Sequence, residues 1–164
     1  MKSTVVIYGS STGTCQSIAE SIASKLGVEA VDVASLSADT VNNNDNLVLG
    51  TSTWGAGEMQ DDWYDGVKVL KSAGLAGKTV ALFGCGDAES YSDTFVGGMK
   101  ELYDAVVEAG ATVLPGVSTG GYTFDDSEAV DGDKFVGLAL DDVNEDDKTE
   151  SRVDAWIEAI KPSL

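Results

Sequence analysis

Four continuous apolar segments, separated by helical patterns, restrict this chain to a small set of folds. The segments are rich in β-branched or aromatic residues and cover 4–8, 28–33, 47–51 and 79–84. Continuous rather than alternating apolarity is typical of strands that are covered on both faces. Helical periodicity lies between them, most clearly in 15–26 and in 99–109. This alternation predicts an α/β fold with a parallel sheet, right-handed crossovers and helices on both faces.

The C-terminal half predicts one more strand and a long loop. A fifth apolar segment starts at 111–115, the stretch 117–134 shows no clean period, and 135–140 again has the pattern of a strand. We therefore expect a loop of roughly twenty residues to interrupt or flank the fifth strand. A loop of this length in a compact domain serves function, an interface or packing, and the sequence leaves these alternatives open.

Shorter patterns complete the prediction. Residues 37–43 leave room for a short helix, and 150–160 form a final amphipathic helix with Val153, Trp156, Ile157 and Ile160 on one face. The acidic patch 141–147 is interpreted as a solvated turn and helix start. The length of 164 residues is near the usual size of one domain. We predict a single domain over residues 1–164, a three-layer doubly wound five-stranded parallel sheet.

The charge balance narrows the possible partners. Ten basic residues stand against 28 acidic ones, for a net charge of −18. Such a field disfavours nucleic acids and anionic membranes and attracts proteins with a basic docking face. Acidity that only maintains solubility or suits a salty habitat is an equal alternative. The apolar run at the N-terminus is too short for a signal peptide or a membrane span. The only two cysteines, Cys15 and Cys85, are expected to be free thiols, as in a reducing compartment. We therefore expect a cytoplasmic protein.

The turn after the first predicted strand is a candidate phosphate site. Residues 9–15 read Gly-Ser-Ser-Thr-Gly-Thr-Cys and lie directly before a helix. Hydroxyl groups and backbone N–H groups at a helix N-terminus favour an anion. The turn has neither the Gly-Lys-Ser/Thr ending of a triphosphate site nor the Gly-x-Gly-x-x-Gly of a dinucleotide site. The alternative is that these hydroxyl groups only cap the helix.

Two further loops place aromatic residues at the same edge of the sheet. Trp54 follows the third strand among small residues, and Tyr91 follows the glycine-rich end of the fourth strand. Taken singly, each aromatic residue is more simply a packing residue. Because ligands of open parallel sheets bind beyond the strand carboxyl ends, where the strand order reverses, the pair predicts a planar ligand between two rings.

Together these motifs resemble the long-chain branch of the flavodoxin family across the whole chain. They are the turn 10–15, Thr53-Trp54 with Gly57-Glu58 and Asp62-Trp63, Phe83-Gly84-Cys85-Gly86-Asp87 followed by Tyr91, and the segments 121–124 and 135–139 around the odd loop. The resemblance implies the strand order 2-1-3-4-5, with the fifth strand interrupted by the loop. It also implies an FMN cofactor with its phosphate on residues 10–15, its ring between Trp54 and Tyr91, and its pyrimidine edge at Asp87.

The set of FMN contacts that follows from the resemblance is Ser10, Ser11, Thr12, Gly13, Thr14, Cys15, Thr53, Trp54, Gly55, Ala56, Gly57, Cys85, Gly86, Asp87, Tyr91 and Thr94. It includes neither a catalytic residue nor a metal ligand. Cys15 departs from the family, which usually has a threonine there, and Gly55-Ala56 replaces larger residues found in many long-chain relatives.

The resemblance implies a monomeric, low-potential one-electron carrier rather than an enzyme. Its partners would be flavodoxin/ferredoxin-type reductases and electron-accepting redox enzymes with basic docking faces. The main alternative is an FMN-dependent NAD(P)H:quinone reductase on the same fold, which would need a substrate pocket over the flavin that a stacked Tyr91 blocks. A phospho-receiver domain is disfavoured because Tyr8-Gly9-Ser10 supplies no carboxylates, and a ligand-free module leaves the loops unexplained.

Overall fold

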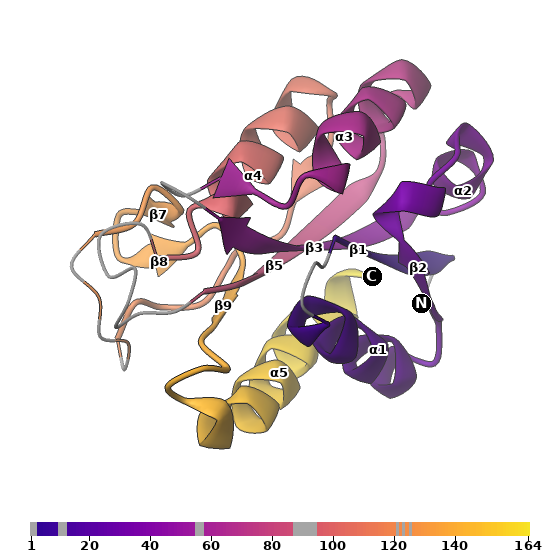
Figure 1. The fold of residues 1–164 in the computed structure, drawn as a ribbon. Coiled ribbons are helices and arrows are strands. Elements are labelled where there is room, and N and C mark those ends of the chain that lie inside the picture. The colour runs from indigo at the N-terminus through magenta and orange to yellow at the C-terminus, as the bar shows by residue number, and fades with distance from the viewer. Residues whose placement is uncertain are drawn as a thin grey trace.

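The structure, a computed structural model, describes residues 3–9, 13–54, 58–86, 95–120, 122, 124 and 126–164. Its elements follow in chain order (Figure 1): β1 Thr4–Gly9, α1 Thr14–Leu26, β2 Glu29–Asp32, η1 Val33–Ser35, α2 Ala38–Asn42, β3 Asn46–Trp54, β4 Glu58–Met59, α3 Asp62–Ala73, β5 Thr79–Cys85, α4 Gly98–Glu108, β6 Thr112–Val113, β7 Val130–Asp131, β8 Lys134–Phe135, β9 Leu138–Leu140, α5 Asp146–Ile160 and η2 Lys161–Ser163.

The main sheet is parallel and has the predicted order. Strand β1 lies between β2 and β3, and β5 lies beyond β3. The edge position next to β5 is shared by β6, which pairs at Thr79 and Val80, and by β9, which pairs from Phe83 to Cys85. The fifth strand is therefore split into two pieces by the segment between them, and the predicted order 2-1-3-4-5 with an interrupted fifth strand is confirmed.

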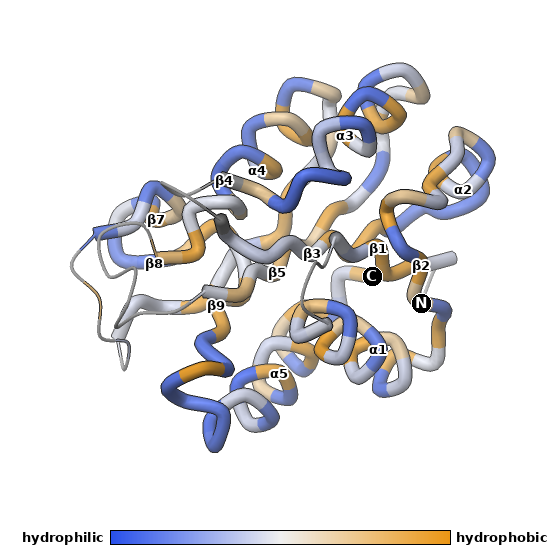
Figure 2. Tube along the Cα trace, viewed as in Figure 1, coloured by the Kyte–Doolittle hydropathy of each residue, from blue (hydrophilic) through white to orange (hydrophobic). Residues whose placement is uncertain are grey.

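Helices cover both faces of this sheet (Figure 1). Helices α1 and α5 lie on one face, and α2, α3 and α4 lie on the other. Alternate residues of β1 divide between two buried clusters, with Val6 facing α1 and Ile7 facing the opposite helices. In Figure 2 blue and orange residues alternate along the helices, as expected of helices with one polar and one apolar side. The predicted apolar face of α5 is confirmed, because Val153 and Trp156 are both buried.

Several elements differ from the sequence-based expectation. Helix α3 was expected only in general, as a helix between two strands, and was given no bounds, because Gly66 and its charged neighbours obscure the periodicity of its buried residues. Strand β4 pairs antiparallel with β3, where only a loop was expected. Strand β2 ends at Asp32 because the carboxylate of that residue accepts a hydrogen bond from the Ala34 N–H (2.9 Å) and starts η1. It is an edge strand and only partly buried, so the expectation of cover on both faces is wrong there.

The expectation of a solvated acidic patch is wrong at its first residue. Asp141 is 1% exposed and directly follows β9. Its carboxylate accepts hydrogen bonds from the backbone N–H (3.0 Å) and the side-chain Nδ2 (2.9 Å) of Asn144. These hydrogen bonds satisfy the buried carboxyl group, and the local turn directs the chain toward α5, whose start at Asp146 agrees with the predicted helix start.

The interruption of the fifth strand depends on two glycines in close backbone contact. A Cβ atom on Gly116 would lie 2.0 Å from the carbonyl oxygen of Phe135. A Cβ atom on Gly137 would lie 2.2 Å from the carbonyl oxygen of Leu82, in β5. The backbone of Val117 joins the two crossing segments: its N–H donates to the Gly137 carbonyl (3.1 Å), and its carbonyl accepts the Phe135 N–H (2.8 Å). The segment between Gly116 and Gly137, the insertion, is thereby held at the edge of the sheet at both of its ends.

Within the part of the chain that the structure describes, no helix is both long and apolar enough to cross a membrane.

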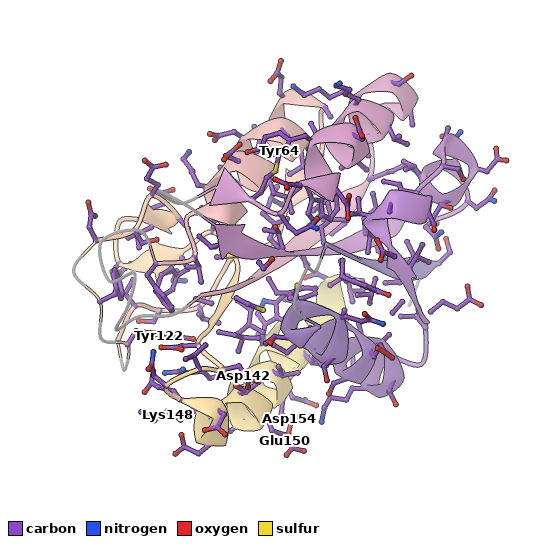
Figure 3. All side chains as sticks on the ribbon, in the orientation of Figure 1. Tyr64, Tyr122, Asp142, Lys148, Glu150 and Asp154 are labelled. Atoms are coloured by element: carbon purple, nitrogen blue, oxygen red, sulfur yellow. The ribbon has the colours of Figure 1, made fainter. Side chains whose placement is uncertain are left out.

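Several of the ten basic side chains already pair with carboxylates, such as Lys25 with Asp154 (2.6 Å) and Lys71 with Glu108 (3.2 Å). Glu150 and Asp154 lie on the outer side of α5 (Figure 3), with side chains 83% and 52% exposed. Most of the 28 carboxylates therefore have no cation of this chain to balance them, since it holds only ten.

We expect the free energy of unfolding to rise by about 2 kcal/mol between 0.05 M and 1 M NaCl. Two like charges 10 Å apart in water repel by about 0.4 kcal/mol, and several such pairs add up on this surface. The screening length falls to about 3 Å at 1 M salt, so the repulsion is removed. Urea unfolding at each salt concentration, followed by circular dichroism, measures the change. A free energy of unfolding that does not change with salt would show that repulsion between the carboxylates does not destabilise the folded chain.

Candidate functional site

The candidate site lies where three neighbouring strands end. In the sheet register Gly9 of β1 pairs with Thr51 of β3, and Thr51 pairs with Gly84 of β5. The chain leaves β1 toward β2 on one side and returns to β3 on the other, so the strand order reverses at this point. The segments predicted to bind FMN all leave these three strands at their carboxyl ends. The structure thus brings the stems of the three loops to one edge.

Helix α1 turns its N-terminus toward this edge. Its N-cap residue, Gly13, has φ +91° and ψ −12°, and its carbonyl accepts the Ser17 N–H (3.0 Å). Gly13 has no side chain with which to cap the helix, and the first turn contains no acidic residue. The N–H groups of that turn and the positive end of the helix dipole suit an anion. Ser10, Ser11 and Thr12 lie outside the described residues.

Cys15 and Cys85 meet beneath these loops. Cys15 is 1% exposed in the first turn of α1, and Cys85 is 6% exposed at the end of β5. Both are free thiols and belong to the core cluster under α1. A hydrogen bond between the two thiols, together with burial, raises the pKa of Cys15 well above its usual range. The side chain of Cys15 therefore packs against the sheet in its neutral form.

The second loop leaves a short antiparallel ladder. Thr53 pairs with Met59 and Trp54 with Glu58, which brings the two ends of the segment 55–57 together. The Thr53 hydroxyl accepts the Gly98 N–H at the start of α4 (3.3 Å). Below the ladder, the Thr51 hydroxyl accepts the Gln60 N–H (2.9 Å). The side chain of Trp54 and the residues Gly55, Ala56 and Gly57 lie outside what the structure describes.

The third loop leaves β5 at Gly86, whose N–H donates to the Leu140 carbonyl of β9 (2.9 Å). A Cβ atom here would lie 3.0 Å from the backbone nitrogen of Val96, so the chain passes closely between these residues. Asp87, Tyr91 and Thr94 fall on residues that the structure does not describe. Their roles remain predictions, but both ends of their segment, Gly86 and Phe95, are placed.

Trp63 supports the edge of the sheet from below. Its side chain is fully buried, and its Nε1 donates to the Gly50 carbonyl of β3 (2.8 Å). A Cβ atom on Gly9 would lie 2.5 Å from the indole Cδ1, so the ring packs directly on the end of β1. The sequence showed Trp63 only as part of a family motif. Its role as support for β1 and β3 depends on contacts that no local pattern reveals.

The described geometry defines a class of protein: a doubly wound α/β protein with a ligand site at the switch point of its sheet. Its helix N-terminus and its small residues fit a phosphate-bearing ligand that approaches the backbone closely.

Comparisons with known proteins identify the family. The family model described as flavodoxin matches residues 6–156. Flavodoxin 1 of Azotobacter vinelandii is 40% identical over 163 residues, covering 95% of this chain and 94% of its own length. The flavodoxin of Helicobacter pylori is 40% identical over 160 residues, covering 97% and 96%. The crystal structure of Fusobacterium nucleatum flavodoxin bound to flavin mononucleotide superposes with a TM-score of 0.92 at 32% identity, covering 100% and 99%. The chain belongs to the flavodoxin family.

Proposed function

We propose that this protein binds one FMN non-covalently at the carboxyl edge of its sheet and carries single electrons at low potential between redox enzymes. The observation that supports this function most is the meeting of the β1, β3 and β5 loop stems at the switch point, beside the N-terminus of α1. A relative of the same fold, the flavodoxin of Fusobacterium nucleatum, has a crystal structure with flavin mononucleotide bound. The protein is a carrier rather than an enzyme.

The phosphate would be held by residues 10–15 through the first-turn N–H groups of α1. Because the thiols of Cys15 and Cys85 contact each other in the core, these two residues would bind FMN through their backbone atoms. Trp54 and Tyr91 would hold the flavin between their rings, and Asp87 would meet its pyrimidine edge. When bound, FMN supplies one-electron transfer, while the protein orients the ring and sets the charge around it.

The acidic surface suits redox partners with basic docking faces, namely flavodoxin/ferredoxin-type reductases and electron-accepting enzymes. Asp61 and Asp62 open α3, directly after the β4 strand that borders the second loop. Carboxylates so close to the site oppose added negative charge on the flavin and lower its potential. We also propose a monomer of one domain over residues 1–164 in the cytoplasm, where the two free thiols stay reduced.

An anaerobic reductive titration of the purified, FMN-loaded protein tests this function. We expect two separate one-electron steps with different visible spectra, because a carrier must hold the flavin in more than one redox state. NADPH alone should leave the bound FMN oxidised, whereas NADPH with a catalytic amount of a flavodoxin-type reductase should reduce it. A protein that takes up no FMN contradicts the proposal. Rapid two-electron reduction by NADPH without a partner would support the quinone reductase alternative instead.

A further inference from the structure

The residues that end the third loop have an unusual backbone. Phe95 and Val96 are fully buried and link the segment 87–94 to α4. Among the residues that the structure describes, Val96 is the one non-glycine with a positive φ, at 47°. A β-branched residue rarely adopts this conformation, which persists only where surrounding contacts enforce it.

The inserted segment holds the backbone of Phe95 on both sides. The Phe95 N–H donates to the carbonyl of Asp126 (3.3 Å), and the hydroxyl of Ser127 donates to the Phe95 carbonyl. That hydroxyl also accepts the N–H of Ala129 (3.1 Å), so its direction is set from two sides. Ser127 is 7% exposed, and water therefore competes little for these bonds.

The ring of Phe95 lies in an aromatic cluster made by the same segment. It stacks on Phe124 with ring centroids 5.4 Å apart and meets Phe135 edge-on at 5.9 Å. Tyr122 completes the cluster, 5.0 Å from Phe135, and donates its hydroxyl to the Ala139 carbonyl of β9 (2.6 Å). Arg152 of α5 lies over the Tyr122 ring at 3.9 Å, and Tyr122 is labelled close to the start of α5 in Figure 3. The cluster is thus anchored to the sheet and to a helix.

The other end of the segment 87–94 depends on the same part of the fold. Gly86 donates its N–H to Leu140 in β9, which follows the insertion directly, and passes within close contact of Val96. Both ends of the segment are therefore held by the interrupted fifth strand and by the residues that interrupt it. Fixing the two ends of a connecting segment reduces the conformational entropy that is lost when the segment binds a ligand.

We propose that the insertion, acting through Ser127 and the aromatic cluster around Phe95, positions the segment 87–94 and thereby sets the affinity and the potential of the bound FMN. This inference rests on the proposed function, since it assigns Asp87 and Tyr91 to the cofactor. Ser127 and Phe95 are positioning residues, because they act on FMN only through that segment. The insertion is then part of the cofactor site as well as of the outer surface.

Ser127→Ala tests the inference with little change in volume, and Ser37→Ala is the matched control. Ser37 caps α2, accepting the Thr40 N–H (3.4 Å), so its loss also removes one hydroxyl that orders the backbone. We expect Ser127→Ala to weaken FMN binding at least fivefold, to shift the midpoint potential of bound FMN, and to speed amide hydrogen exchange of the segment 87–95. Ser37→Ala should leave the dissociation constant and the exchange rates within twofold of the wild type and the midpoint potential unchanged. Ser127→Thr, which keeps a hydroxyl, should restore part of the affinity.

The outcomes separate the inference from the function it rests on. A wild-type protein that binds FMN, with an unchanged dissociation constant and potential in Ser127→Ala, overturns the inference alone and leaves the insertion with a packing role. Equal losses of affinity in Ser127→Ala and Ser37→Ala overturn it too, because the effect then follows general stability. A wild-type protein that takes up no FMN overturns the proposed function and with it the role of Ser127 in the cofactor site.

Discussion

Replacing Gly137 by alanine should lower the free energy of unfolding by about 3 kcal/mol, which is at the upper end for overpacking. The new Cβ atom would lie 2.2 Å from the carbonyl oxygen and 2.7 Å from the carbonyl carbon of Leu82. Both atoms are backbone of β5, a central strand, so no side chain can rotate away to relieve the clash. Either the strand pairing from Phe83 to Cys85 or the crossing at Gly116 must then open.

Gly120→Ala is the control for this substitution. Gly120 lies in the same insertion, and a Cβ atom there would meet only the Ser118 hydroxyl at an ordinary 3.5 Å. Urea unfolding of the two variants and the wild type, followed by circular dichroism, should show a large loss for Gly137→Ala and a change within about 0.5 kcal/mol for Gly120→Ala. Equal stability of both variants would mean that the edge of the sheet relaxes without cost.

Replacing Gly13 by alanine should weaken FMN binding by about tenfold or more. Gly13 has a left-handed backbone at the N-cap of α1, which disfavours any residue with a Cβ atom by about 1–2 kcal/mol. Relief of this strain turns the first-turn N–H groups away from their direction in the wild type. One hydrogen bond to a charged group contributes about 1.5–3 kcal/mol, so the loss of one is enough for this change. Fluorescence quenching of FMN by the apoprotein measures the dissociation constant.

The opposite end of the same helix provides the control. Gly27 is the C-cap of α1, is also left-handed at φ 72°, and also has open space around its Cβ position. Gly27→Ala should therefore destabilise the apoprotein about as much as Gly13→Ala, but it should leave FMN binding unchanged. If the two variants bind FMN equally well, the N-terminus of α1 does not hold the phosphate.

The sequence alone was sufficient to predict the framework. Continuous apolar segments are buried on both faces in β1, β3 and β5, so these strands were predictable without knowledge of their neighbours. The same pattern failed at β2, because that strand lies at the edge of the sheet. The spacing of Ile18, Ile22 and Leu26 likewise predicted the buried face of α1. The break after 111–115 in the last apolar segment predicted a loop that interrupts or flanks the fifth strand, and the resemblance to long-chain flavodoxins implied that the strand is interrupted. These properties are periodic and local, and the edge where the loops meet follows from the parallel order of the strands.

Other features depended on residues that are distant in sequence. Helix α3 is stabilised as Trp63 packs on Gly9 and donates to Gly50, and the contact between Cys15 and Cys85 joins a helix to a strand seventy residues away. The bond from Ser127 to Phe95 spans 32 residues.

The insertion separates most clearly what the sequence predicts from what only the tertiary structure decides. Its sequence, with glycines, aspartates and scattered aromatic residues, predicted a loop and left its role open. Only the tertiary structure decided that its aromatic residues gather around Phe95 and that its glycines let two backbones cross at the edge of the sheet. Periodicity reports which residues are buried, whereas the identity of the neighbour against which each is buried is a property of the folded chain.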